Sequence, residues 1–123
     1  MDAKKTILHI DDEDDIREIV EFALEDDFEI FSFASAKEAL EQAHSIKADI
    51  LLLDVMMPEM DGPKAMTELK KIDHLKDLPV IFMTAKVNTS EINELIELGG
   101  DGVIRKPFNP LSLPEEIFSY LEA

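Results

Sequence analysis

The sequence contains no cysteine, which excludes disulfides, zinc–thiolate centres and thiol catalysis. It also has no apolar run close to the roughly 20 residues that a membrane-spanning helix needs. The two lysines near the N-terminus are followed by only a few apolar residues and then by an acidic cluster, which is not the pattern of a signal peptide. These absences predict a cytoplasmic protein without a membrane segment.

Positive charge is scarce as well. The chain has 12 lysines and arginines against 28 aspartates and glutamates, which gives a formal net charge of −16. Arg17 is the only basic residue between Asp11 and Glu29. Such a surface repels phosphate backbones, so the composition argues against nucleic-acid binding. The expected partners are proteins, cations, or both, and most surface carboxylates are expected to serve solubility alone.

What the chain does have is a regular alternation of strand-like and helix-like segments. Its 123 residues, 46% of them hydrophobic, are enough to bury one core. The expected strands are residues 6–10, 28–33, 50–53, 79–83 and 102–104. The first expected helix is residues 14–25, and the second begins at the Ser35–Glu38 capping box. The third is opened by Gly62 and Pro63, the fourth is ended by Gly99, and the last includes Ile117.

The pattern predicts an α/β fold. The strand at residues 50–53 is apolar throughout, as expected for a strand that helices cover on both faces. Five strand–helix units of this kind predict one five-stranded parallel sheet between two helical layers. Residues 1–123 are expected to form a single domain, because no linker or repeat interrupts the pattern. The end at residue 123 leaves no room for an output module, although an excised domain of a larger protein would look the same.

Polar residues follow four of the five expected strands. They are Asp11 and Asp12 after the first strand, Asp54 after the third, Thr84 after the fourth and Lys106 after the fifth. Ligands of open parallel sheets bind beyond the carboxyl ends of the strands, near the switch in strand order. With the strand order 2-1-3-4-5, three carboxylates, one hydroxyl and one ammonium would converge on one pocket.

The chemistry of that pocket is restrictive. Three neighbouring carboxylates repel one another unless a cation binds among them, and an all-oxygen set favours a hard divalent ion, Mg²⁺ or Mn²⁺. Because Mg²⁺ takes few protein ligands and accepts substrate oxygens, the site is expected to hold a phosphoryl group as well. Lys106 and Thr84 can bind phosphoryl oxygens, and Asp54 can attack phosphorus to form an aspartyl-phosphate.

Four short motifs lie in order along the chain, each at the end of an expected strand. They are Ile-Leu-His-Ile-Asp-Asp-Glu at residues 7–13, Asp-Val-Met-Met-Pro-Glu-Met-Asp-Gly at residues 54–62, Thr84-Ala85, and Lys106-Pro107-Phe108. Over essentially the whole chain, the sequence resembles the receiver domains of two-component response regulators, in particular a stand-alone, chemotaxis-regulator-like receiver. The resemblance implies a flavodoxin-like, three-layer fold. It also implies phosphorelay signal transduction, with a phosphohistidine donor on a sensor histidine kinase or a histidine phosphotransfer protein.

The resemblance makes Asp54 the phosphoacceptor. It implies that Asp12, Asp54 and the backbone carbonyl of Met56 bind the Mg²⁺ directly, while Asp11 acts through a metal-bound water. Slow self-hydrolysis of the aspartyl-phosphate would end the signal, so the protein is not expected to be a multiple-turnover enzyme.

The remaining motif residues are implied to respond to the phosphate. Lys106 would pair first with Asp54 and then with the phosphate, and Thr84 would move inward toward a phosphoryl oxygen. The peptide bond between Lys106 and Pro107 would be cis, which proline makes feasible. The sequence departs from the family at Val103, where receivers often carry an aromatic ring that moves with the threonine. This departure predicts a smaller change on the output surface.

Two surfaces are also implied by the resemblance. The phosphodonor is expected to dock on the first helix near Ile16 and beside Pro107-Phe108. The downstream protein is expected to bind the fourth helix, the fifth strand and the last helix, roughly residues 86–105 plus the C-terminal helix. Lys86 and Met56 resemble positions that tune the lifetime of the phosphate.

Several residues have a structural interpretation instead. Glu13, Asp14 and Asp15 are expected to favour the dipole of the first helix rather than to bind a metal. His9 is expected to be a core or strand-end residue. The methionines at positions 56, 57 and 60 are expected to anchor their loop by packing, or else to form part of a partner surface.

The residues argue against three other functions. A small phosphatase with an aspartyl nucleophile would need a second aspartate two residues after Asp54, where the sequence has Met56. A flavin carrier of the same fold would need a first loop rich in hydroxyls and glycine, and here that loop is acidic. A degenerate receiver that works by contact alone would lack Asp54 or Lys106, and both are present.

Overall fold

Five β-strands alternate with five α-helices along residues 4–85 and 88–121, the part of the chain that the computed structural model describes. The strands are β1 (Lys5–Ile10), β2 (Phe28–Phe33), β3 (Ile50–Asp54), β4 (Val80–Thr84) and β5 (Gly102–Arg105). The helices are α1 (Asp14–Leu24), α2 (Ala36–Gln42), α3 (Gly62–Leu69), α4 (Thr89–Glu97) and α5 (Leu113–Leu121). Short 3₁₀ helices follow α2 at Ala43–Ser45 and α3 at Asp73–Leu75. The predicted alternation is confirmed, and each strand boundary lies within one residue of its prediction.

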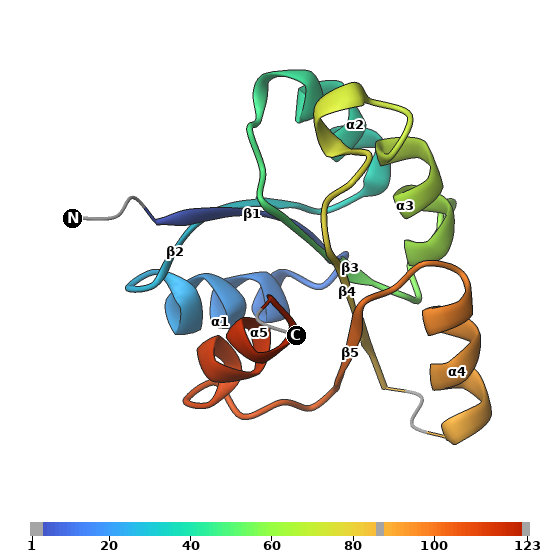
Figure 1. The fold of residues 1–123 in the computed structure, drawn as a ribbon. Helices are drawn as coiled ribbons and strands as arrows, with labels where there is room; N and C mark the ends of the chain where they lie inside the picture. Colours follow the sequence, from blue (N-terminus) through green and yellow to red (C-terminus); the bar gives the residue numbers. More distant parts are fainter. Residues whose placement is uncertain (1–3, 86–87, 122–123) are drawn as a thin grey trace.

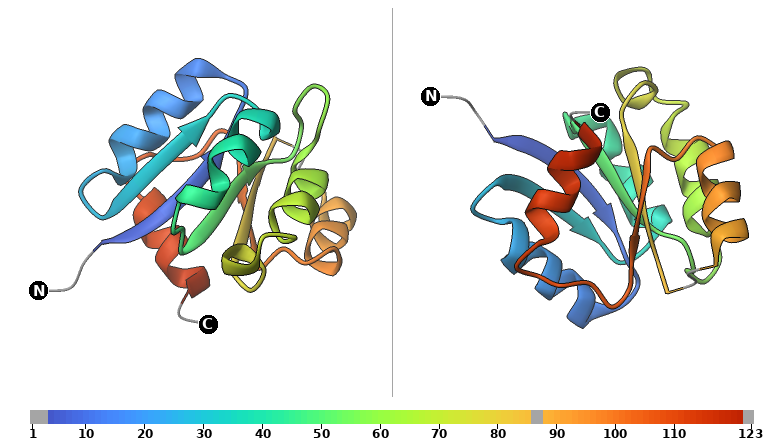
Figure 2. Two further views of the ribbon diagram at one scale, coloured as in Figure 1. Left: turned by 90° about the horizontal axis from the view of Figure 1, so that it is seen from above. Right: turned by 60° about the horizontal axis from the view of Figure 1, so that its bottom comes forward.

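All five strands form one parallel sheet in the order β2-β1-β3-β4-β5, as the sequence predicts. Helices α1 and α5 cover one face of the sheet, and α2, α3 and α4 cover the other (Figures 1 and 2). The chain leaves β1 toward β2 on one side and returns to β3 on the other side of β1. The switch in strand order therefore lies between β1 and β3, where ligands of such sheets bind.

Two apolar clusters, one on each face of the sheet, form the core. The alternation of side chains along β3 separates them: Leu51 and Leu53 belong to the cluster under α2, α3 and α4, and Leu52 belongs to the cluster under α1 and α5. All residues of β3 are buried. Because both faces of this strand are covered, a polar residue is tolerated only at its end, which is where Asp54 stands.

The helix ends follow the local signals of the sequence. The Ser35 hydroxyl accepts the N–H of Glu38 at 3.2 Å, and the Glu38 carboxylate accepts the N–H of Ala34, one residue before the cap, at 3.2 Å, so both side chains of the predicted capping box hold the start of α2. Asp61 caps α3 by accepting a backbone N–H from the first turn at 2.9 Å. Gly99 follows α4 with a φ of +124°, a conformation that favours glycine.

Of the two interpretations given for the methionines after β3, packing is wrong for Met56, for which the partner surface remains as the alternative. The Met56 side chain does not anchor its loop, since it is 60% exposed. Met57 and Met60 pack against the core and already occupy the inner side of the loop, which leaves Met56 facing solvent. Within the described residues, every helix is too short or too polar to cross a bilayer.

Candidate functional site

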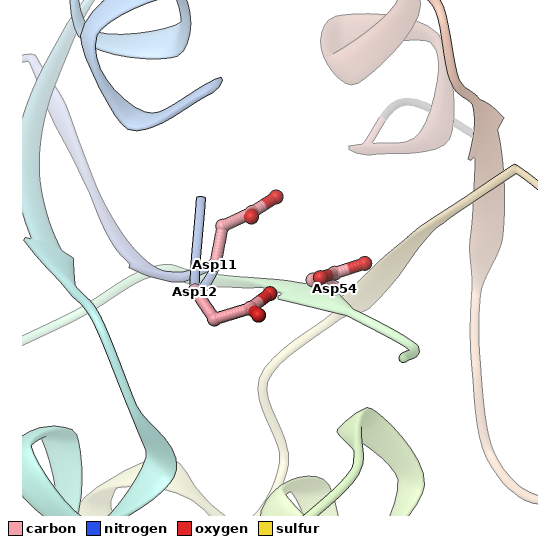
Figure 3. Close-up of side chains that lie close together, drawn as sticks. All are labelled: Asp11, Asp12 and Asp54. Atoms are coloured by element: carbon pink, nitrogen blue, oxygen red, sulfur yellow. The ribbon is translucent and has the colours of Figure 1, made fainter. Parts of the chain in front are cut away.

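Three carboxylates meet at the carboxyl edge of the sheet. Asp54 is the last residue of β3 and is buried, whereas Asp11 and Asp12 directly follow β1. Asp11 is fully buried and Asp12 is exposed. One ligand oxygen from each of the three lies within 4.8 Å of the others, and Figure 3 shows the side chains gathered beside the ends of these two strands. The sheet order thus brings together residues that are more than 40 positions apart in the sequence.

Lys106 completes the cluster from the end of β5. Its ammonium lies 2.7 Å from Asp11 Oδ2 and 3.2 Å from Asp54 Oδ1, and only 11% of its side chain is exposed. The resemblance implied a pair with Asp54, and the structure adds a shorter contact with Asp11. The peptide bond between Lys106 and Pro107 is cis, as the resemblance implied. A single, partly exposed ammonium therefore faces two buried carboxylates.

The backbone around the first acidic pair is held by polar contacts. Asp11 Oδ1 accepts the N–H of Glu13 at 3.0 Å, which leaves its other oxygen for Lys106. The Arg17 guanidinium donates to the Asp11 carbonyl oxygen at 2.6 Å and also pairs with the Asp14 carboxylate. These contacts fix the direction of the Asp11 side chain, because they tie the turn after β1 to the start of α1.

The other side of the site depends on a glycine. A Cβ atom at Gly62 would lie 2.5 Å from the backbone oxygen of Asp54 and 3.0 Å from Val55 Cα. The Gly62 N–H donates to the Val55 carbonyl at 2.9 Å. The start of α3 can approach the end of β3 this closely only because residue 62 has no side chain.

The electrostatics of the cluster change the pKa of two of its members. Burial and the negative charge of Asp11 raise the pKa of Asp54 to about 6, although Lys106 opposes the change. Burial acts to lower the pKa of Lys106, but its hydrogen bond to Asp11 and the charges of Asp11 and Asp54 outweigh it, so that pKa is raised. Asp54 is thus a carboxylate whose charge is poorly compensated, and Lys106 keeps its proton.

Thr84 and Met56 lie on the β4 side of the cluster. Thr84 is the last residue of β4 and is buried, and its carbonyl accepts the N–H of Lys106 at 2.8 Å. Thr84, Met56 and residues of α4 line a cavity of about 230 Å³ beside the end of β3. Lys86, the other position that resembled a tuning residue, lies outside the described residues. Val103 is half-buried against the core rather than turned toward the cluster.

Some neighbours of the site were not predicted from the sequence. The Glu13 carboxylate, interpreted as a helix-dipole residue, lies 3.8 Å from the Lys106 ammonium. In the sequence Arg17 stands out only as an isolated positive charge in an acidic run, and that isolation is the one available signal for its contact with Asp11. Asp14 and Asp15 do lie in the first turn of α1, as predicted.

His9 is a core residue, as predicted. It is fully buried in β1, and its Nδ1 lies 3.1 Å from the Ser32 hydroxyl. Burial and the positive charges of Lys106 and Arg17 lower its pKa to about 3, so the imidazole is neutral at physiological pH.

The donor chemistry fits a hard divalent cation. The three carboxylates that converge are oxygen donors, and their spacing of 4.8 Å or less allows one ion to contact several of them. Three carboxylates against one ammonium leave an excess of negative charge that a divalent ion would neutralise. Sulfur and imidazole ligands, which softer metals prefer, do not occur in the cluster.

Solved structures with the same architecture define the class. The chemotaxis protein CheY4 of Vibrio cholerae superposes with a TM-score of 0.89 at 28% identity, over 96% of this chain and 99% of that chain. A putative response regulator from Chloroflexus aurantiacus gives a TM-score of 0.87 at 30% identity, over 98% of this chain and all of that one. The protein therefore has the CheY-like flavodoxin fold.

Sequence comparison assigns the family. The model of the response regulator receiver domain matches residues 7–118, and the chain belongs to this family of two-component receiver domains. The transcriptional regulatory protein SrrA of Staphylococcus aureus is 42% identical over 105 residues. That match covers 85% of this chain and 42% of SrrA, so the chain spans less than half the length of this relative.

Proposed function

We propose that this chain, over residues 1–123, is a receiver that accepts a phosphoryl group from a phosphohistidine donor onto Asp54 in a reaction that requires Mg²⁺ or Mn²⁺. The observation that carries the proposal is the position of the Asp54 carboxylate. It lies between two other carboxylates and the partly exposed ammonium of Lys106, at the edge of the sheet where such folds bind ligands.

A divalent cation would be held by Asp12, Asp54 and the Met56 carbonyl, with Asp11 acting through water, and it would neutralise negative charge on the phosphoryl oxygens. Asp54 is the nucleophile: one carboxylate oxygen forms a bond to phosphorus while the bond from phosphorus to the donor histidine breaks. The electron pair of that bond returns to the imidazole.

Lys106 has a different task before and after transfer. Before transfer its ammonium reduces the repulsion between Asp11 and Asp54, which it contacts at 2.7 and 3.2 Å. After transfer it can donate to a phosphoryl oxygen, because it keeps its proton. Thr84, at the end of the adjacent strand, supplies a hydroxyl that moves inward to donate to a second oxygen.

The cycle ends by hydrolysis rather than by turnover. Water attacks the aspartyl-phosphate and regenerates the Asp54 carboxylate, so the chain is a phosphoacceptor with slow autophosphatase activity. The phosphatase alternative is not favoured, because the side chain two residues after Asp54 is the exposed thioether of Met56 and cannot act as a general acid.

The signal would leave the site through proteins in the cytoplasm. The phosphodonor would dock on α1 and beside Pro107-Phe108, where exposed apolar side chains such as Phe22 are available on the helix. A downstream target would bind the face made by α4, β5 and α5, or the phosphoryl group would pass onward in a phosphorelay. Neither role requires a contact with nucleic acid or a membrane, and the net charge of −16 disfavours the former.

Acetyl phosphate is the direct test, since it needs no partner protein. Incubation with Mg²⁺ should add one phosphoryl group to the intact mass of the wild type, and chelation of the metal should prevent it. Asp54→Asn should abolish the gain, whereas Asp26→Asn, at an exposed position in the turn after α1, should leave it unchanged. The proposal fails if the wild type gains no mass or if Asp54→Asn gains as much as the wild type.

A further inference from the structure

A hollow of about 550 Å³ lies between β2 and α2, on the surface of the molecule. It is lined by Phe31 and Phe33 of β2, by Glu38, Glu41 and Gln42 of α2, and by Ser45 and Ile46 after that helix. Its base is apolar, and Phe31 remains 39% exposed there. None of the residues assigned to the phosphoryl site lines it.

The strand beside this hollow is an edge of the sheet. Among the described residues, β2 pairs only with β1, so its other side has no strand neighbour. The Asp11 N–H donates to the Phe33 carbonyl at 3.1 Å, which shows that the backbone of Phe33 faces β1. Because the backbone groups of successive residues point to alternate sides of a strand, those of Phe31 also face β1, and those of Ile30 and Ser32 face the open edge.

The edge and the hollow lie on the same part of the surface. The Phe31 side chain projects to the α2 face of the sheet, into the hollow, while the adjacent residues present their backbone groups sideways. An extended chain added beside β2 would therefore place alternate side chains over Phe31. Main-chain hydrogen bonds would supply affinity, and the hollow would select the side chains.

The charge at the rim limits what such a segment can carry. Glu38 and Glu41 are exposed on α2 above the apolar base, and no lysine or arginine lines the hollow. The closest acidic residue of β2, Glu29, is exposed as well. A second copy of this chain would bring another net charge of −16 to an acidic rim, which disfavours self-association. A basic segment is attracted instead.

We propose that the β2–α2 hollow binds an extended, basic segment of a protein partner, which adds as a sixth strand to the open edge of β2. An apolar side chain of the segment covers Phe31, and a lysine or arginine pairs with Glu38 or Glu41. The site does not depend on phosphorylation of Asp54. It provides a second place of contact, at the opposite edge of the sheet from β5.

The test is a selection of random heptapeptides on the full chain, followed by resynthesis of the enriched peptides and titration by fluorescence anisotropy. Enriched sequences should alternate apolar residues with lysine or arginine. Their affinity should fall at least tenfold with Phe31→Ala and with Glu41→Lys. Phe22→Ala, which removes a phenylalanine that is 76% exposed on α1, should have no effect. Glu41→Lys changes an exposed residue of a helix and should fold normally, so it tests the site even if Phe31→Ala is unstable.

Amide hydrogen exchange locates the bound peptide. Exchange at Ile30 and Ser32 should slow on binding, and a proline placed in the centre of the peptide should abolish the effect. The proposal is overturned if no peptide is enriched, if binding survives both Phe31→Ala and Glu41→Lys, or if the two amides are not protected. Self-association through β2 in sedimentation would assign the edge to a second copy and would also overturn it. Asp54→Asn should bind the peptides as tightly as the wild type does. The peptide proposal can therefore fail or hold independently of the phosphorylation proposal.

Discussion

At the scale of single residues, the site is an arrangement of charges that is unbalanced without a bound cation. Asp11 and Asp54 are buried, and the Lys106 ammonium is shared between them at 2.7 and 3.2 Å. Asp12 adds a further negative charge from the surface. The raised pKa of Asp54 expresses this imbalance, because burial and the charge of Asp11 make its charged form less favourable in the metal-free folded protein than in the unfolded chain.

The pH dependence of stability follows from that pKa. Since the Asp54 pKa rises from 3.8 to about 6 on folding, the folded protein binds more protons than the unfolded chain between these values. The contribution of this group to stability is therefore lost as pH rises through the window. Asp54→Asn removes the charge, so without metal the variant should match the wild type below pH 4 and exceed it at pH 7 by up to about 3 kcal/mol.

Urea unfolding with a chelator at pH 4 and pH 7 measures this difference. Asp26→Asn is the matched control and should show no such dependence on pH. A variant Asp54→Asn that is less stable than the wild type at pH 7 would mean that the Lys106 contact outweighs the burial of the charge.

Removal of the Lys106 ammonium should lower the stability of the metal-free protein, whereas removal of the Asp54 charge should raise it. Lys106→Gln leaves Asp11 and Asp54 buried without their shared cation, which should reduce the free energy of unfolding by about 3 kcal/mol in the absence of metal. Added Mg²⁺ should recover part of that loss. Lys71→Gln is a useful comparison: Lys71 contacts Glu68 at 2.8 Å but is 67% exposed, so its loss should cost under about 1 kcal/mol. Equal losses in the two variants, measured by urea unfolding, would argue against a buried ion pair.

At the scale of secondary-structure elements, the sequence was informative about where strands begin and end. All five strands were located to within one residue, and the apolar runs of β3 and β4 gave the clearest signal, because a strand covered on both faces holds few polar residues before its end. The packing of the loop after β3 was not predictable from composition. Its three methionines look alike in the sequence, yet Met57 and Met60 pack inward while Met56 is 60% exposed.

The close approach of α3 to β3 gives a prediction about the backbone. Gly62→Ala introduces a Cβ 2.5 Å from the Asp54 carbonyl, so the end of β3 or the start of α3 must shift. We expect a loss of about 1–3 kcal/mol in stability, together with weaker Mg²⁺ binding. In Gly100→Ala a Cβ would meet the Phe82 ring at 2.8 Å, far from the acidic cluster. Gly100→Ala should lose stability, but its affinity for Mg²⁺ in a calorimetric titration should be unchanged. If both variants lose the same Mg²⁺ affinity, the metal site responds to overall stability and not to the backbone at Gly62.

At the scale of the whole molecule, the residues of the site could be predicted because strand order converts separated positions into neighbours. Asp11, Asp54 and Lys106 were grouped from the sequence by their place at strand ends, and the sheet order brings them together. The finer arrangement was not predictable. Nothing in the spacing indicates that Lys106 lies closer to Asp11 than to Asp54, or that Arg17 holds the Asp11 carbonyl, since both depend on side-chain directions set by tertiary packing.

The overall charge adds a general salt effect that must be separated from specific binding. With a net charge of −16, the folded protein should gain stability from NaCl through screening. MgCl₂ at the same ionic strength should raise the free energy of unfolding further than NaCl does. The extra stabilisation should be about 2.7 kcal/mol when free Mg²⁺ is at a hundred times its dissociation constant. Asp12→Asn should remove that excess, and Asp15→Asn, another exposed carboxylate in the same acidic run, should keep it. Equal effects of the two salts on the wild-type melting temperature would exclude a specific metal site.

The most direct measurement for the central claim is the position of the phosphoryl group on the chain. After treatment with acetyl phosphate and Mg²⁺, borohydride reduction converts an aspartyl-phosphate into homoserine, which fragment mass analysis locates. We predict homoserine at position 54 and at no other carboxylate. Homoserine at Asp11 or Asp12, with position 54 unchanged, would contradict the account.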